Sequence, residues 1–368
     1  MFTARQEAIL RAVRREGAVR VTEIAAELRV SQMSVRRDIN ALAEAGIVNR
    51  VHGGAVLAAL PAAGGPGAAP GRGRPLSLGM VVPSPSTYFH QLVHGARVAA
   101  ESLHAQLRIG FSNYNDGEDG ALVRRMLDDR LDGLLLTPSC SLEEARPTLG
   151  WLAALDTAVV IVERRQEASA VVDSFDYVSS HHEHGALQAL RHLVDGGHRR
   201  IALLARPSTT SHWIARAFDL ATDHYDLPRD TPRNITVHPR DDAEADAQVE
   251  RFLDDVARTG VTAVVAHPDV QAIMLVQRAR ARGWTLPDEL AVVAYDDSLA
   301  TLADIPLTAV APPRHTVGRI AVGRLVQRIR EGAAHIPQHI LVPPQLNIRA
   351  STSGWRGGSG DHRGHAPA

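Results

Sequence analysis

The sequence predicts an α/β protein in which a small N-terminal winged helix-turn-helix domain precedes two doubly wound parallel sheets. Three observations support this: residues 58–75 form a Gly/Pro-rich stretch, short apolar runs alternate with helical stretches beyond it, and 368 residues are too many for one core. The runs are LSLGMVV, DGLLLT, TAVVIV, RRIALLA, TAVVAH and LAVVAY. Near-continuous apolar strands of this kind are typical of parallel sheets that helices cover on both faces.

Composition narrows the possible classes of function. The formal net charge is -1, so any affinity for nucleic acid must come from a local patch. Cys140, the single cysteine, has no partner for an internal disulfide, and the start MFTARQEAIL lacks the pattern of a secretory signal. Because no apolar run approaches the roughly 18 residues that span a bilayer, we expect a cytoplasmic protein without a membrane partner.

The first 57 residues have the spacing of a helix-turn-helix domain. A capping box at Thr3 and Gln6 starts one helix, which stops at Gly17. A second helix follows an N-cap at Thr22, and a third begins at Ser31 after a brief turn. The segment IVNRVHGGAV then alternates and turns at a Gly-Gly pair, as a two-stranded wing would.

The third helix separates an apolar face from a polar one. Val35, Ile39 and Leu42 recur at helical spacing and must face the core. Residues 1–57 contain nine Arg, five Glu and one Asp, which gives a local charge of +3 that suits phosphate. The candidate DNA-binding residues on the other helix faces and on the wing are Gln32, Ser34, Arg36, Arg37, Asn40, Arg50 and His52.

The segment VSQMSVRRDINALAEAGIVNRVHGGA resembles the DNA-binding domain of the DeoR family of bacterial repressors. The resemblance covers nearly all of residues 1–57 and implies that Arg36 and Arg37 lie on a recognition helix. There an arginine can read guanine or clamp a phosphate, and the sequence leaves open which arginine does which. The alternative is a solvated helix face, or an intrahelical pair between Asp38 and one of the two arginines.

Residues 76–353 resemble the ligand-binding core of the LacI/GalR repressors, a relative of periplasmic sugar-binding proteins. The segments that carry this resemblance are LGMVVPSPSTYFHQLVHGARVAAE, DGLLL, VIVER, GGHRRIALL, TAVVAHPDVQAI, LAVVAYDDS and LVPPQLNIRAST. It implies a periplasmic-binding-protein-like core of two lobes, one at about 76–176 and 298–328 and the other at about 177–297 and 329–353. We expect residues 58–75 to be a flexible linker and residues 354–368 a disordered tail.

The resemblance and the order of strands together indicate a ligand cleft. Ligands of parallel sheets bind beyond the carboxyl ends of strands, where several polar and aromatic side chains fall. An aromatic ring with Asp, Asn and Arg side chains suits a sugar or a nucleoside. Tyr88 and Phe89 could equally be core residues, and Asp269 only a helix N-cap. The candidate ligand-binding residues are Tyr88, Phe89, Asn113, Glu163, Arg164, Thr210, Asp269 and Asp296.

Three departures from the LacI/GalR pattern put the ligand and the allosteric route in doubt. Ser180 stands where the resemblance leads us to expect an Asp, and Arg216 is displaced by two positions from the expected arginine near Phe218. The hinge helix expected between the domains is replaced by the Gly/Pro stretch.

The sequence therefore predicts a regulator, most simply a homodimeric repressor. Its affinity for operator DNA would be controlled by a sugar. The alternatives are a ligand-independent or nucleoside-responsive regulator, a sugar-modifying enzyme, and a periplasmic solute receptor. We expect no enzyme, cofactor or metal site, because the sequence has no H-E-x-x-H, Cys-x-x-Cys, phosphate-loop or G-x-S-x-G motif. The HHEH run at 181–184 places neighbouring side chains on different faces.

Overall fold

The computed structural model describes residues 5–6, 8–9, 12–13, 18–28, 30–44, 48–51, 54–57, 74–114, 116–139, 146–154, 157–165, 174–235 and 242–355. The chain divides into two compact units, Met1–Pro75 and Leu76–Ala368. The division falls at the end of the Gly/Pro-rich stretch. Most of the expected linker and tail, residues 58–73 and 356–368, lies outside the described residues.

The N-terminal unit has a helix-turn-helix core and a three-stranded sheet. The described residues 5–6, 8–9 and 12–13 are helical and precede β1 (Ala18–Arg20), α2 (Val21–Glu27), α3 (Gln32–Glu44), β2 (Val48–Val51) and β3 (Gly54–Leu57). The sheet has the order β1-β3-β2 with antiparallel pairs, so the predicted two-stranded wing gains a third strand. Gly54 allows this pairing, because a Cβ there would lie 2.0 Å from the Val19 carbonyl oxygen. α2 begins at Val21, one residue before the predicted N-cap.

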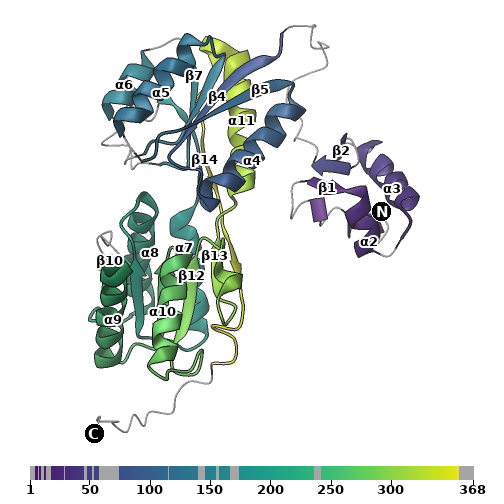
Figure 1. Ribbon diagram of the computed structural model, residues 1–368. Helices are drawn as coiled ribbons and strands as arrows, with labels where there is room; N and C mark the ends of the chain where they lie inside the picture. Colours follow the sequence, from purple (N-terminus) through teal and green to yellow (C-terminus); the bar gives the residue numbers. More distant parts are fainter. Residues whose placement is uncertain are drawn as a thin grey trace. The chain divides into compact units, whose positions relative to one another are not determined.

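The first lobe of the large unit is a six-stranded, fully parallel sheet of order β14-β8-β7-β6-β4-β5. Helices α4 and α11 pack on one face and α5 and α6 on the other (Figure 1). The elements are β4 (Leu76–Val82), α4 (Thr87–Ser102), β5 (Ala105–Phe111), α5 (Asp116–Asp128), β6 (Gly133–Leu136), α6 (Arg146–Ala153), β7 (Ala158–Val162), β8 (Asp176–Ser180), α11 (Arg314–Glu331) and β14 (His339–Val342).

The second lobe is another six-stranded sheet, of order β10-β9-β11-β12-β13-β15, in which only the edge strand β15 is antiparallel. Helices α7 and α8 cover one face, and α9 and α10 cover the other. The elements are α7 (His182–Asp195), β9 (Ile201–Ala205), α8 (Thr209–Tyr225), β10 (Arg233–Ile235), α9 (Asp242–Thr259), β11 (Ala263–His267), α10 (Asp269–Ala281), β12 (Ala291–Tyr295), β13 (Thr308–Ala311) and β15 (Gln345–Asn347). The predicted fold class, two doubly wound sheets behind a winged helix-turn-helix, is confirmed.

The chain crosses between the lobes three times, each time later than the sequence predicts. The crossings lie at residue 181, at 312–313 and at 343–344, rather than after 176, 297 and 328. The reason is strand pairing: β8 pairs with β7 and β14 with β8 in the first sheet, whereas β13 joins β12 in the second. Which sheet a short apolar strand joins depends on partners far along the chain.

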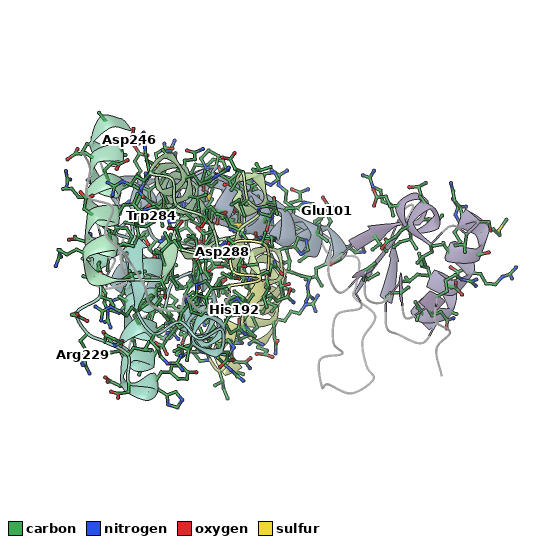
Figure 2. The ribbon with its side chains drawn as sticks, turned by 90° about the horizontal axis from the view of Figure 1, so that it is seen from below. Glu101, His192, Arg229, Asp246, Trp284 and Asp288 are labelled. Carbon is green, nitrogen blue, oxygen red and sulfur yellow. The ribbon has the colours of Figure 1, made fainter. Side chains whose placement is uncertain are left out.

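Two features of the outer surface complete the fold. Charged side chains such as Glu101, Arg229 and Asp288 are exposed around the large unit (Figure 2), and no helix in the described part of the chain is long and apolar enough to span a membrane. Trp355, which the sequence placed in the expected tail, packs on His198 with ring centroids 3.8 Å apart. The large unit therefore extends to residue 355.

Candidate functional site

Helix α3 presents a basic face to solvent. Gln32, Arg36 and Arg37 are exposed, and Ser34 and Asn40 are partly exposed. The opposite face is buried against the core of the unit through residues 35, 39 and 42, as the helical spacing predicts. The side chain of Arg50 and the whole of His52 lie outside the described residues.

A buried acid on α3 leaves the two central arginines of that helix available. Asp38 is 5% exposed and its carboxylate forms an ion pair with Arg5, whose Nη2 donates to Oδ1 at 3.3 Å. The hydrogen bond that Arg5 donates to Asp38 raises the pKa of Arg5 above its usual value. Asp38 therefore anchors the first helical segment rather than forming an intrahelical pair, and Arg36 and Arg37 form no ion pair with any described residue. Met33, which the sequence reasoning left out, is 72% exposed on the same helix.

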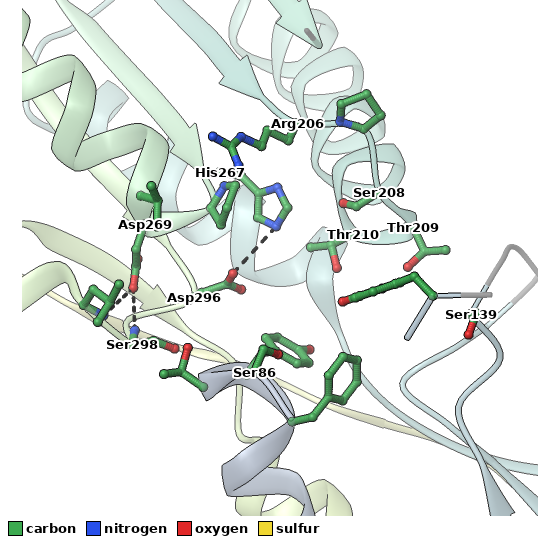
Figure 3. A pocket seen from close by; sticks show the side chains of 18 of the residues that line it. Ser86, Ser139, Arg206, Ser208, Thr209, Thr210, His267, Asp269, Asp296 and Ser298 are labelled. Carbon is green, nitrogen blue, oxygen red and sulfur yellow. Dashed lines mark hydrogen bonds and ion pairs between the residues drawn. The ribbon is translucent and has the colours of Figure 1, made fainter. Parts of the chain in front are cut away.

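A cavity of about 680 Å³ lies between the two lobes of the large unit. The first lobe contributes residues 86–89 at the start of α4, Tyr114, Ser139 and Arg164. The second contributes residues 206–210, 267–270, Asp296, Ser298 and Leu299 (Figure 3). The volume falls in the range of small-molecule sites. We call this cavity the cleft.

Six of the eight predicted ligand residues line the cleft: Tyr88, Phe89, Arg164, Thr210, Asp269 and Asp296. Phe89 is also buried in the first lobe's core, which is the alternative the sequence left open. Asn113 is exposed and is not among the lining residues, whereas its neighbour Tyr114 is. Glu163 is not a lining residue either. The cleft residues that the sequence reasoning missed are chiefly neighbours of predicted ones, such as His267, Ser298 and Tyr114.

The Glu163 carboxylate points away from the cleft towards the crossing between the lobes. It accepts hydrogen bonds from the Ser180 backbone N–H at 3.1 Å and from Ser180 Oγ at 2.8 Å, and lies 3.6 Å from Nε2 of His182. Burial raises its pKa, but the hydrogen bonds from His182 and Ser180 outweigh burial and leave the pKa of Glu163 below its usual value. Glu163 is thus a buried anion that joins β7 to β8 and α7.

Asp269 is committed to the loop that follows β12. Its carboxylate accepts backbone N–H groups from Asp297 at 3.2 Å, Ser298 at 2.5 Å and Leu299 at 2.6 Å. Burial raises the pKa of Asp269. Its side chain therefore fixes the shape of one cleft wall rather than capping its own helix.

Asp296 is the cleft carboxyl without such a role. It is 9% exposed, and its Oδ1 has no hydrogen-bond partner among the described residues. Burial raises the pKa of Asp296 to about 8 and lowers that of His267 to about 3. The 3.8 Å approach of His267 Nε2 to Oδ2 therefore joins two mostly neutral groups at pH 7.

Two arginines lie at the first lobe's side of the cleft. Arg164 is 8% exposed; its Nη1 donates to the Glu163 carbonyl at 2.8 Å, and its Nε has no partner in the described structure. The Arg314 guanidinium lies 4.9 Å from the Tyr88 ring centroid and donates to Ser298 Oγ at 2.9 Å. Both guanidinium groups are buried cations, which is costly without a partner.

A second contact between the lobes lies beside the cleft. The Arg165 guanidinium stacks 3.5 Å from the ring centroid of Trp213 in α8, and its Nη2 lies 3.4 Å from a Glu183 carboxylate oxygen. Arg216, the arginine displaced from the family pattern, pairs with Glu183 at 2.9 Å. Arg165 belongs to the first lobe and its partners to the second, so this cluster joins the lobes.

The HHEH run serves local structure. His181 Nδ1 accepts from the His184 backbone N–H at 3.3 Å, which caps α7, and His182 Nδ1 lies 3.3 Å from the Tyr295 hydroxyl. Across the described portions of the chain, no group of three or more His, Cys, Asp or Glu side chains could hold a metal ion.

Comparison with known families agrees with this architecture. Residues 5–59 match a DeoR-like helix-turn-helix domain, and residues 190–352 match a periplasmic binding protein-like domain. The arabinose metabolism transcriptional repressor of Geobacillus stearothermophilus is 25% identical over 344 residues, which cover 90% of each chain. Both predicted domain types are thereby confirmed.

Two solved structures show the same fold as the large unit. One is the complex of the transcriptional regulator CelR with cellobiose, which has a TM-score of 0.64, 24% identity, and coverage of 76% of this chain and 86% of that one. The other is a LacI family transcriptional regulator from Enterococcus faecium with bound ribose, with a TM-score of 0.61, 20% identity, and coverage of 76% and 100%. The chain therefore joins a DeoR-like helix-turn-helix domain to a periplasmic binding protein-like core with the fold of the LacI family regulators.

Proposed function

We propose that this protein is a DNA-binding transcriptional repressor whose affinity for its operator is controlled by a sugar bound in the cleft. One observation carries the proposal: a single chain combines an exposed arginine face on a helix-turn-helix core with a ligand-sized cleft between two lobes. The first feature suits the phosphates and base edges of a DNA major groove. The second is where two-lobed α/β proteins close on a small molecule.

The cleft chemistry favours a polyhydroxylated ligand. The Tyr88 and Tyr114 rings offer apolar faces, and hydroxyl groups at Ser139, Thr209 and Thr210 surround them. Rings cover the apolar faces of sugars while hydroxyl and amide groups satisfy their hydroxyls. The regulators of similar fold that hold cellobiose and ribose, and the related arabinose repressor, support the same ligand class.

We further propose that the protein acts in the cytoplasm as a homodimer, because two helix-turn-helix domains related by a twofold axis match the symmetry of a repeated operator. Ligand would shift the dimer between states that bind DNA well and poorly. An allosteric coupling of about 1 to 3 kcal/mol corresponds to a roughly 5- to 150-fold change in operator affinity.

The DNA-binding half is tested by selecting binding sites from fragmented genomic DNA with the purified full chain, followed by footprinting. Arg36→Ala and Arg37→Ala should each weaken binding to the selected site roughly tenfold or more, since a good base contact contributes about 1 to 3 kcal/mol. The matched control is Arg229→Ala, which removes an exposed arginine of the large unit (Figure 2). Equal affinities for all four proteins would contradict the proposal.

The sensor half is tested by thermal shift against mono- and disaccharides. A ligand at 100 times its Kd adds roughly 2.7 kcal/mol to stability. Tyr88→Ala should abolish the shift caused by any sugar that binds, and that sugar should change the operator affinity of the wild-type chain. A sugar that binds without changing operator affinity would refute the regulatory role of the cleft.

A further inference from the structure

We propose that the effector is a sugar that carries an anionic group, a phosphate or a carboxylate, and that Arg164 holds this group in the cleft. The inference rests on the proposed function, because it names the ligand class of the same site. Four observations support it. Arg164 is buried without an ion pair, the Glu163 carboxylate points away from the cleft, and three helices begin at the cleft. The fourth is that the carboxyl groups of Asp269 and Asp296 do not compete for Arg164.

Arg164 is a buried cation that forms no ion pair with a described carboxylate. It lines the cleft at 8% exposure, and no carboxylate oxygen of the described residues lies within 4.0 Å of its guanidinium nitrogens. Its nearest protein acceptor is the Glu163 backbone carbonyl, and its Nε hydrogen remains unused. A buried guanidinium is stabilised best by a carboxylate or phosphate, to which it can donate two parallel hydrogen bonds. The partner that Arg164 lacks is therefore an anion.

The neighbouring acid is held out of the cleft. Glu163 directly precedes Arg164, yet its carboxylate bonds Ser180 and faces His182 on the far side of β7. The side chain at residue 180, where the resemblance predicts an Asp, is a neutral serine that donates to Glu163. Glu163 and Asp119 act on Arg164 only through space, and neither forms an ion pair with it, so the contact position beside the guanidinium is open to an anionic ligand.

Three helices begin at the cleft and point their N-termini at it. Their first residues line it: Thr87 in α4, and Thr209 in α8 and Asp269 in α10, which Figure 3 shows. The N–H groups of a first helical turn have no partner within the helix, and the helix dipole adds partial positive charge there. Ser208 Oγ already caps α8 by accepting the Ser211 N–H, so it is the partial positive charge of these helix ends, more than free N–H groups, that adds to the preference set by Arg164.

The remaining carboxyl groups do not oppose an anion. Asp269 keeps its carboxylate oxygens on three loop N–H groups, so these oxygens face the loop that follows β12. Asp296, with its pKa raised to about 8, is mostly protonated at pH 7 and can donate a hydrogen bond. Arg206, on the second lobe's wall, adds a further positive charge.

Isothermal titration with matched sugars tests the inference. The probes are glucose, glucuronate and glucose 6-phosphate; galactose and galacturonate; ribose and ribose 5-phosphate; and inorganic phosphate alone, in phosphate-free buffer with about 0.15 M NaCl to screen non-specific attraction. The proteins are the wild type, Arg164→Gln, Arg164→Lys and the matched control Arg165→Gln, which changes the adjacent arginine outside the cleft lining.

The expected result is an acidic sugar that binds the wild type at least roughly tenfold more tightly than its neutral counterpart. Arg164→Gln should reduce that ratio to about one, Arg164→Lys should retain part of it, and Arg165→Gln should leave the ratio unchanged. The glucose set contains both a carboxylate and a phosphate, so glucuronate and glucose 6-phosphate together show which anion the site prefers.

Two results would overturn the inference and leave the sensor proposal standing: a neutral sugar that binds as tightly as its acidic form, or an acid preference that survives in Arg164→Gln. If inorganic phosphate alone binds as tightly as any sugar phosphate, the site recognises an anion rather than a sugar, which also overturns it. If no sugar of either kind binds, the inference fails together with the sugar-effector proposal, while operator binding is judged by its own assay.

Discussion

Replacing Asp296 by Asn should make the folded protein more stable at neutral pH. The carboxyl group is 9% exposed and its Oδ1 makes no hydrogen bond with the described residues, so burial raises its pKa to about 8. The groups around it are Arg314, which lowers the pKa, Asp269 and Glu163, which raise it, and the His267 ring at 3.8 Å. Asn has nearly the same shape and cannot ionise, so it removes the penalty that burial imposes.

The size of the gain follows from the difference in pKa between the folded and unfolded states. An acid whose pKa is higher when folded loses stability as the pH rises from its unfolded to its folded pKa, because unfolding lets it ionise. With an ordinary value of 3.8 and a folded value of about 8, about three pH units of this range lie below pH 7. At about 1.4 kcal/mol per unit, the penalty at pH 7 is about 4 kcal/mol, and it disappears below about pH 4.

Urea unfolding followed by circular dichroism at pH 5, 6, 7 and 8 measures this gain directly. Asp296→Asn should exceed the wild type by a margin that grows with pH, to roughly 2 to 4 kcal/mol at pH 7. Asp297→Asn is the matched control, since that carboxylate accepts from Arg349 at 2.7 and 2.8 Å and from Asn347 at 2.7 Å. Its loss should destabilise by about 1 to 3 kcal/mol.

A margin for Asp296→Asn that is absent, or equal at pH 5 and pH 8, would refute this reasoning. It would mean that Asp296 ionises in the cleft with its ordinary pKa. The cleft would then be solvated well enough to hold a carboxylate.

Three further substitutions test other parts of the molecule. Gly318→Ala should destabilise the large unit by roughly 1 to 3 kcal/mol in urea unfolding, because the new Cβ would lie 2.1 Å from a backbone oxygen of α4. The control is Gly323→Ala on the same helix, whose Cβ meets nothing within 4 Å and which should not destabilise the unit. Asp38→Asn should lower the melting temperature of the N-terminal unit and weaken operator binding, because it removes the buried partner of Arg5; an unchanged melting curve would show that the pair is not structural. Arg165→Gln should weaken the binding of neutral and acidic effectors alike by up to roughly fivefold in a titration, because it removes a contact that joins the lobes. A change in affinity for only one class of effector would contradict this role.

The fold was predictable where the pattern is local. The helix-turn-helix spacing and the alternation of apolar strands with helices depend on residues a few positions apart, and both agree with the observed elements. Strand β1 was missed because three residues, Ala18–Arg20, carry no period of their own and form a strand only by pairing with β3. The lobe crossings were misplaced for the same reason, since β8 and β13 join their sheets through long-range pairing.

The cleft was predictable to the extent that strand ends define it. Arg164 and Asp296 follow β7 and β12 closely, and the rule that ligands bind beyond the carboxyl ends of parallel strands places them correctly. The direction of a side chain at such an end is not a property of the strand. Glu163 and Asp296 both have positive φ values, 54° and 106°, yet one carboxyl group turns to the interior and the other lines the cleft.

The direction of the Glu163 side chain bears on the ligand that we propose. The carboxylate accepts two hydrogen bonds from Ser180, which stands where the resemblance predicts an Asp, so the glutamate that follows β7 supplies the negative charge that β8 lacks. Because Glu163 does not line the cleft, its carboxylate does not compete with an anionic ligand for the Arg164 guanidinium. The same displacement keeps a buried negative charge near enough to Asp296 to help raise the pKa of that group. A serine where the resemblance predicts an aspartate leaves the end of β8 without a carboxylate of its own, which agrees with the acidic sugar that we propose.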